Sequence, residues 1–307
     1  MSLPIVFSPE IAAARINKTP IVALESTIIT HGMPFPQNVE TARRVEAEVR
    51  ACGAIPATIA IFDHQIHVGL TDAQLDRLGQ AQNVRKLSRA DLAACLVRGG
   101  TGATTVAATM ICARLAGIEV FATGGIGGVH RGAAQSFDIS ADLPELAQTA
   151  VTVVAAGAKA ILDLPKTLEY LETQGVPVIA FGQDDFPAFW SRSSGLKAPI
   201  RMDSALEIAK AHMLRGRLGL PGGQLVANPI LIEDEIPQTE IMPHIDTALA
   251  AAATQGIAAK AVTPFLLQQI FELTSGRSLR SNIGLVLNNA RLAARIAGEI
   301  AKLRGKS

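Results

Sequence analysis

The sequence is poor in aromatic and charged residues. Phe, Trp and Tyr together make up 4% of its 307 residues and Asp, Glu, Lys and Arg 18%, whereas hydrophobic residues reach 49%. Small aliphatic side chains must therefore fill the interior, which is typical of a parallel sheet covered by helices on both faces. The formal net charge of +1 argues against a surface that binds nucleic acid.

Cysteine is also scarce, and Cys52, Cys95 and Cys112 do not have the spacing of a metal site. Cys95 and Cys112 fall on predicted helices, where we expect reduced, buried thiols. The N-terminus lacks the apolar region of a signal peptide, and no run of roughly 18 apolar residues is free of charge. We therefore expect a cytoplasmic protein without a membrane span. The sequence contains no P-loop motif, which argues against a nucleotide cofactor.

Strand and helix signals alternate along the chain. They predict strands at 20–25, 57–62, 84–87, 119–122, 151–156, 176–181 and 225–227, and helices at 37–52, 104–115, 162–173, 244–255, 264–274 and 282–304. This order predicts a three-layer α/β/α fold with a mostly parallel central sheet and a helical C-terminal part. We expect a single domain over residues 1–307. Residues 183–200 are predicted to form a long excursion, either a lid or a surface loop.

A glycine-rich loop follows the predicted strand at 119–122. Gly124, Gly125, Gly127 and Gly128 occupy four of five positions and are followed by His130 and Arg131. Glycines in such a loop are expected to adopt positive φ and to turn N–H groups toward an anion. If the next segment is extended, Asp138, Ser140 and Asp142 project to one side. These features predict a site for a phosphorylated or polar ligand; the alternative is a mobile surface loop.

Lys159 lies in the apolar run VTVVAAGAKAILDL at residues 151–164. Burial disfavours an ammonium ion and so favours the nucleophilic amine. The alternative is a lysine that reaches the surface or pairs with Asp163. Glu25 ends the strand predicted at 20–25 and is a candidate general acid, with a structural ion pair as the alternative.

Further polar residues lie close to other predicted strand and helix ends. Lys86 can neutralise a phosphate or be a solvated lysine, and Thr101 to Thr105 either bind an anion at a helix N-terminus or cap that helix. Asn282 is predicted to open the last helix, where capping is the simpler interpretation. Since ligands bind outside the carboxyl ends of parallel strands, these residues predict one active site.

Several segments together resemble one enzyme family. They are ALESTIITHGMPFPQN, RGGTGATTVAATM, FATGGIGGVHRGA, FDISADL, AGAKAILDL and VANPI. The sequence is similar, over about residues 9–303, to the pseudouridine-5′-phosphate glycosidases (pseudouridylate synthases) and to the related indigoidine synthase A-like proteins. One departure is Thr101, since the family often has Asn before GATT.

The resemblance implies reversible cleavage of the C1′–C5 glycosidic bond of pseudouridine 5′-phosphate to uracil and ribose 5-phosphate, in pseudouridine catabolism. It implies a divalent metal, usually Mn²⁺, and a homotrimer that binds neither nucleic acid nor membranes. It also implies that Lys159 is a nucleophile that forms an imine with the sugar, that Glu25 is the proton donor and that Asp138 holds the metal. The substrate-binding residues that it implies are Lys86, Val106, His130, Ser140, Ala141, Asp142 and Asn282.

Two other functions agree with the residues alone. A small-molecule kinase on a similar sheet would bind a nucleotide and give Lys159 no covalent role. A non-catalytic sensor of sugar phosphates would use Lys86 and the glycine loop but would not need Glu25 together with Lys159. Turnover of ribose 5-phosphate and uracil without a nucleotide separates all three functions.

Overall fold

The computed structural model describes residues 3–257 and 262–305. Its strands are β1 (Ile5–Phe7), β2 (Ile21–Leu24), β3 (Ile55–Phe62), β4 (Gln65–Val68), β5 (Arg85–Leu87), β6 (Thr101–Thr104), β7 (Val120–Ala122), β8 (Thr152–Ala155), β9 (Val178–Phe181), β10 (Ile200–Met202) and β11 (Gln224–Ala227). Its α-helices are α1 (Pro9–Ile16), α2 (Thr27–His31), α3 (Gln37–Ala51), α4 (Asp72–Gln80), α5 (Leu92–Arg98), α6 (Val106–Leu115), α7 (Ala133–Ser136), α8 (Asp142–Gln148), α9 (Leu164–Thr173), α10 (Ala205–Arg217), α11 (Gln238–Thr254), α12 (Val262–Leu273) and α13 (Arg277–Gly305). A short 3₁₀ helix, Arg89–Asp91, precedes α5.

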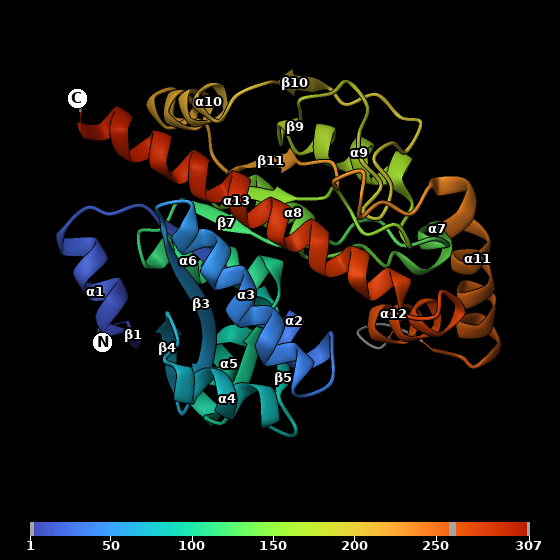
Figure 1. Cartoon of the computed structure of the whole chain (residues 1–307), viewed down its shortest axis with the longest axis horizontal. Coiled ribbons are helices and arrows are strands. Elements are labelled where there is room, and N and C mark those ends of the chain that lie inside the picture. The colour runs from blue at the N-terminus through green and yellow to red at the C-terminus, as the bar shows by residue number, and fades with distance from the viewer. Residues whose placement is uncertain (1–2, 258–261, 306–307) are drawn as a thin grey trace.

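The described strands form one 11-stranded sheet with the order β1-β4-β3-β2-β7-β8-β11-β9-β10, and β6 joins it to β5. Strands β2, β7, β8 and β11 are parallel neighbours, whereas β3 is antiparallel to both β4 and β6. Helix α13 crosses one face of the sheet with α3 and α10 beside it, and α6 and α8 cover the other face (Figure 1). The predicted three-layer fold with a mostly parallel sheet is confirmed. The single domain that we expect over 1–307 stays a prediction.

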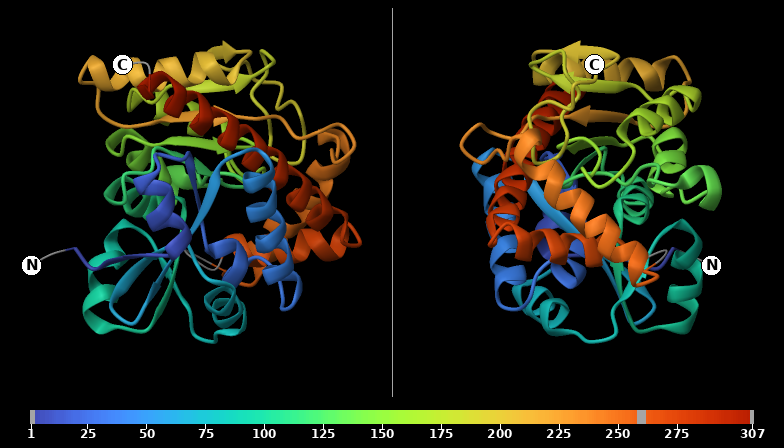
Figure 2. Two further views of the ribbon diagram at one scale, coloured as in Figure 1. Left: turned by 60° about the vertical axis from the view of Figure 1, so that its left-hand side comes forward. Right: turned by 90° about the vertical axis from the view of Figure 1, so that its right-hand side faces the viewer.

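The C-terminal part is helical, as predicted. Helices α11 and α12 pack against each other beside the start of α13, at one side of the sheet (Figure 2). Helix α13 begins at Arg277, so Asn282 lies inside the helix and does not cap it. Among the described residues, no helix combines the length and the apolar character needed to cross a membrane.

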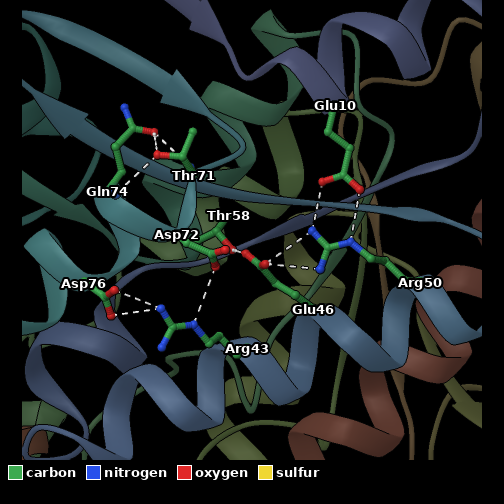
Figure 3. Close-up of polar contacts among 9 residues, drawn as sticks. All are labelled: Glu10, Arg43, Glu46, Arg50, Thr58, Thr71, Asp72, Gln74 and Asp76. Atoms are coloured by element: carbon green, nitrogen blue, oxygen red, sulfur yellow. Dashed lines mark hydrogen bonds and ion pairs between the residues drawn. The ribbon is translucent and has the colours of Figure 1, made fainter.

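Polar contacts tie α3 to its neighbours on three sides (Figure 3). The Thr58 hydroxyl of β3 donates to Glu46 Oε1 at 2.6 Å, and burial raises the pKa of Glu46. Arg50 donates to Glu10 of α1 at 2.8 Å, and Arg43 donates to Asp76 of α4 at 2.9 Å. Because the last two pairs are exposed, water screens them and each adds little stability. The buried apolar face of α3 provides most of its attachment.

The predicted helix at 104–115 begins two residues later than expected. Residues Thr101–Thr104 form β6, which pairs antiparallel with β3 through Ala60, Ile61 and Phe62. The buried Thr104 hydroxyl donates to the Ile59 carbonyl at 2.9 Å, and the Thr104 N–H donates to Ser26 Oγ at 2.9 Å. These distant partners, which local sequence patterns do not reveal, hold the segment as a strand.

The excursion at 183–200 is not a plain surface loop. Phe186, Ala188, Phe189, Trp190 and Ser191 are all buried, and the segment packs against the start of α13. Its backbone is joined to distant parts of the chain, because Phe189 N–H donates to the Ala156 carbonyl and Ile236 N–H donates to the Trp190 carbonyl, each at 2.9 Å. The segment is therefore part of the core, and its function as a lid stays a hypothesis.

Candidate active site

A polar cavity of about 300 Å³ lies at the carboxyl ends of β2, β7 and β8. Because these strands are parallel neighbours, the segments that follow them meet at one edge of the sheet. The cavity is lined by all the predicted site residues except Asn282, namely Glu25, Lys86, Val106, His130, Asp138, Ser140, Ala141, Asp142 and Lys159. The predicted convergence of strand ends is thus observed, and the chemical roles of these residues stay predictions.

A second, more apolar cavity of about 100 Å³ adjoins the first. Glu25, Lys86 and Lys159 line both cavities. The second cavity is further lined by Asn282 and by apolar side chains, including Met33, Phe189, Leu267, Leu279, Leu285 and Val286. The two cavities together form one site with a polar part and an apolar part, joined at the candidate acid and the candidate nucleophile.

The Glu25 carboxylate is held by two threonine hydroxyls. Thr27 Oγ1 donates to Glu25 Oε2, and Thr123 Oγ1 donates to Glu25 Oε1. Across the described residues Glu25 forms no ion pair, so the donors that hold its carboxylate there are neutral hydroxyl groups. Thr27 and Thr123 are not among the residues predicted from the sequence; the available signal was that Thr123 directly follows β7 and that Thr27 opens α2 just after β2. Glu25 lines the cavity with both of its oxygens held by hydroxyl groups.

Lys159 is half-buried in the turn that follows β8. Its backbone N–H donates to the Ile126 carbonyl at 3.1 Å, which fixes the residue against the glycine loop. Asp163 pairs instead with Lys166, at 2.6 Å between Oδ2 and Nζ, so the alternative of a Lys159–Asp163 pair is wrong. No ion pair of Lys159 occurs within the part of the chain that the structure describes. The residue lines both cavities.

His130 and Asp138 lie on facing extended segments. The His130 N–H donates to the Asp138 carbonyl at 3.0 Å, and Nδ1 lies 4.0 Å from Asp138 Oδ2. Burial lowers the pKa of His130; Lys159 and Lys86 lower it further, while Asp138 opposes them. The imidazole is therefore mostly neutral at pH 7, so it can accept as well as donate a hydrogen bond to a ligand hydroxyl.

The glycines between 124 and 128 allow close packing; they are not needed for a left-handed backbone conformation. Of the five glycines between 124 and 132, only Gly132 has a left-handed φ, of 81°. A Cβ on Gly125 would lie 2.7 Å from the Phe189 ring, and one on Gly128 would lie 2.5 Å from Thr167 Oγ1. Most loop N–H groups bind protein acceptors, since Ile126 donates to the Gly157 carbonyl and Val129 to Thr167 Oγ1. The prediction that positive φ angles turn the N–H groups of this loop toward an anion is therefore wrong.

Asp142 joins two walls of the cavity. Its buried carboxylate accepts the Gly127 N–H at 2.8 Å and the Ala107 N–H at 2.9 Å. Ala107 lies in the first turn of α6, where free backbone N–H groups can bind an anion. The Asp142 carboxylate already accepts one of these N–H groups. Thr105 caps the same helix by accepting the Ala108 N–H at 3.5 Å, as the capping interpretation predicts.

The metal ion expected at Asp138 would have few protein ligands. Within residues 3–257 and 262–305, no group of three or more His, Cys, Asp or Glu side chains is placed to hold a metal ion. The Asp138 side chain is 39% exposed and lines the cavity. One open carboxylate fits a hard divalent cation that keeps most of its water ligands, and it does not fit a closed nitrogen–sulfur site.

The chain matches one family model, described as "Indigoidine synthase A like protein", over residues 10–299. It is 71% identical over 297 residues to a pseudouridine-5′-phosphate glycosidase of Jannaschia sp. (strain CCS1), which covers 97% of this chain and 98% of that protein. A pseudouridine-5′-phosphate glycosidase of Geobacillus kaustophilus (strain HTA426) is 57% identical over 297 residues, with 97% and 99% covered.

Two solved structures share the fold over almost the whole chain. The prealnumycin C-glycosynthase AlnA, solved in complex with ribulose 5-phosphate, superposes with a TM-score of 0.92 at 37% identity and covers 100% of both chains. An indigoidine synthase A-like protein from Thermotoga maritima superposes with a TM-score of 0.88 at 33% identity and covers 97% of both chains.

Gly127→Ala should destabilise the protein, because the added Cβ would lie 2.1 Å from Ser140 Oγ and 2.8 Å from Asp142 Oδ2. We expect a loss of about 1–3 kcal/mol of unfolding free energy, measured by denaturant titration. Gly216→Ala is the matched control, since its Cβ meets no atom within 4 Å and alanine favours the helix by roughly 1 kcal/mol. Equal stability of Gly127→Ala and the native chain would contradict the packing role of this glycine.

Proposed function

The chain belongs to the family of indigoidine synthase A like proteins, and from this we propose that it is an enzyme that reversibly cleaves the C–C glycosidic bond of pseudouridine 5′-phosphate. The products are uracil and ribose 5-phosphate. The observation that carries the proposal is that Glu25 and Lys159 line both the polar and the apolar part of one cavity. An acid and an amine thus lie where the sugar and the flat uracil ring would meet.

The glycosidic carbon–carbon bond explains why an amine is needed. A carbon leaving group has no lone pair that an acid can protonate, so acid catalysis alone does not labilise the bond. In the first step, the Lys159 amine attacks C1′, the C1′–O4′ bond breaks and Glu25 protonates O4′. Nucleophilic catalysis of this kind divides one difficult step into easier ones. The paired carboxylates of ordinary glycosidases would not require a lysine.

The carbon–carbon bond then breaks from the opened sugar. The Lys159 nitrogen passes its extra proton to the Glu25 carboxylate, and Glu25 then protonates C5 of the uracil ring. The nitrogen lone pair forms a protonated C1′=N imine as the C1′–C5 bond breaks, and the electron pair of that bond re-forms the C5=C6 double bond of uracil. Water adds to the imine and releases ribose 5-phosphate, which restores the Lys159 amine. In the reverse direction the same imine accepts uracil through C5.

Each part of the cavity suits one half of the substrate. In the polar part, Lys86, Ser140 and Ala141 would bind the sugar phosphate, because they add a positive charge, a hydroxyl and an exposed backbone segment to its lining. Val106, His130 and Asp142 would shape its walls. In the apolar part, Asn282 would bind uracil beside Phe189.

We expect the Lys159→Arg variant to fold and to lose turnover, because a guanidinium forms no imine with a sugar aldehyde. Borohydride with ribose 5-phosphate should add the mass of the sugar to Lys159 in the native protein and to no residue in Lys159→Arg. Glu25→Gln is the matched control. It should bind ribose 5-phosphate but turn over roughly 10²–10⁴-fold more slowly, as positioned acid–base groups contribute that much.

Sugar mass on another lysine, or on none, would exclude the covalent role of Lys159. Near-normal turnover of Glu25→Gln would instead show that this carboxylate is structural, and would leave the lysine assignment standing.

A divalent cation, in particular Mn²⁺, is a further part of the proposal, with Asp138 as its protein ligand. Such an ion, when bound, would neutralise negative charge on a phosphorylated substrate. We expect a chelator to abolish activity and added Mn²⁺ to restore it, because a single carboxylate holds the ion weakly. Asp138→Asn should need more Mn²⁺ for half-maximal activity. Full activity after exhaustive chelation, or zinc that copurifies in stoichiometric amount, would contradict this part.

We also infer a homotrimer. Its support is the low charge content of 18% and the exposed leucines around α10, Leu206, Leu214, Leu218 and Leu220, which a subunit contact would cover. A cyclic trimer requires two different patches that meet around a threefold axis. Light scattering should give about three times the chain mass of 32.2 kDa; an active monomer at micromolar concentration would contradict the trimer.

A further inference from the structure

The apolar part of the cavity is backed by a tryptophan that contacts Asn282. Trp190 is the only tryptophan in the sequence and is 1% exposed. Its indole Nε1 donates to Asn282 Oδ1 at 2.6 Å and lies 3.2 Å from the Ser278 carbonyl. Ser278 and Asn282 are one helical turn apart in α13, so the indole N–H sits across that turn.

The indole decides which way the Asn282 amide points. An indole N–H can only donate, so the Asn282 atom that faces it must be the carbonyl oxygen. Asn282 is half-buried and lines the apolar cavity. Its Nδ2 forms no hydrogen bond with the residues that the structure describes, and it is not among their fully buried atoms without partners. The amide therefore presents its NH₂ group, and not its oxygen, to the cavity.

Trp190 is itself held firmly. Its carbonyl accepts the Ile236 N–H at 2.9 Å, and its ring packs edge-to-face on Phe189 with 5.0 Å between centroids. Phe189 has a left-handed φ of 61°, a costly conformation outside glycine that surrounding structure must maintain. The Phe189 ring lies against Gly124 and Gly125. The pair thus links the glycine loop to Asn282 through packed rings.

We propose that Trp190 is a positioning residue that fixes the Asn282 amide as a hydrogen-bond donor, so that the site selects a pyrimidine with a carbonyl oxygen at the edge facing Asn282. This rests on the proposed function. Uracil has carbonyl oxygens at both C2 and C4. Cytosine carries an amino group at C4, and isocytosine carries one at C2. An amino group of the base that faces Asn282 Nδ2 would place two hydrogen-bond donors against each other and leave both unpaired. Buried unpaired donors are costly, which is the basis of the selection.

Trp190→Phe tests this proposal, because it removes the N–H and keeps an aromatic ring. Inhibition constants for uracil, cytosine and isocytosine would be measured against cleavage of pseudouridine 5′-phosphate. The amide of the variant can rotate and present its oxygen, so the preference for uracil over one of the two amino pyrimidines should fall by about three- to tenfold, the value of one hydrogen bond. The yield of the borohydride-trapped adduct with ribose 5-phosphate should stay unchanged, since Asn282 does not line the polar cavity proposed for the sugar phosphate.

Asn282→Ala, with and without Trp190→Phe, separates positioning from general packing. If Trp190 acts through the amide, adding Trp190→Phe to Asn282→Ala should not change the uracil preference further. The proposal is overturned by an unchanged preference in Trp190→Phe, by an equal change in the Asn282→Ala background, or by a parallel loss of the sugar adduct. A native protein that forms neither the adduct nor the cleavage products would refute the proposed function, and with it any selection of the base.

Discussion

The site depends on one buried carboxylate, that of Asp142. It accepts N–H groups from Gly127 in the loop after β7 and from Ala107 at the start of α6, and so joins the two segments that form opposite walls of the polar cavity. A carboxylate that accepts two backbone donors needs no charged partner to be stable in the interior. The close approach requires glycine at 127, where a side chain would occupy the position of the Asp142 and Ser140 oxygens.

The division of the cavity into polar and apolar parts follows from which elements line each part. The polar part is built on β5, on the loop after β7 and on the segment 138–142, which pairs with that loop through Val129 and Ile139. The apolar part is built on α12, α13 and Phe189. Glu25 and Lys159, which follow β2 and β8, line both parts, as does Lys86 of β5. Reactive groups placed at such a boundary can act on a bond between a polar and an apolar half of one ligand.

Long-range hydrogen bonds, more than local ones, orient the functional groups. Thr123 holds one oxygen of Glu25 across 98 positions of the sequence, and Trp190 holds Asn282 across 92. The bond from Thr27 to the other oxygen of Glu25 is local, since these residues are two positions apart. A side chain held in this way loses little further freedom when a ligand binds, which favours binding. The same contacts make the excursion at 183–200 part of the site's framework.

The sequence by itself determined the order of strands and helices, and with it the site's location. Hydrophobic periodicity marked β2, β7 and β8, and parallel strands place their carboxyl ends at one edge, so the order of elements alone predicts that Glu25, the glycine loop and Lys159 meet there. Only the tertiary structure decided that Thr101–Thr104 is a strand and that α13 begins before Asn282. It also decided that the loop glycines make room for Ser140, Phe189 and Thr167, and that threonines hold Glu25. Most of these depend on a partner far away in the sequence, such as Ser26 for Thr104 and Thr123 for Glu25. Local propensity carries no information about such partners.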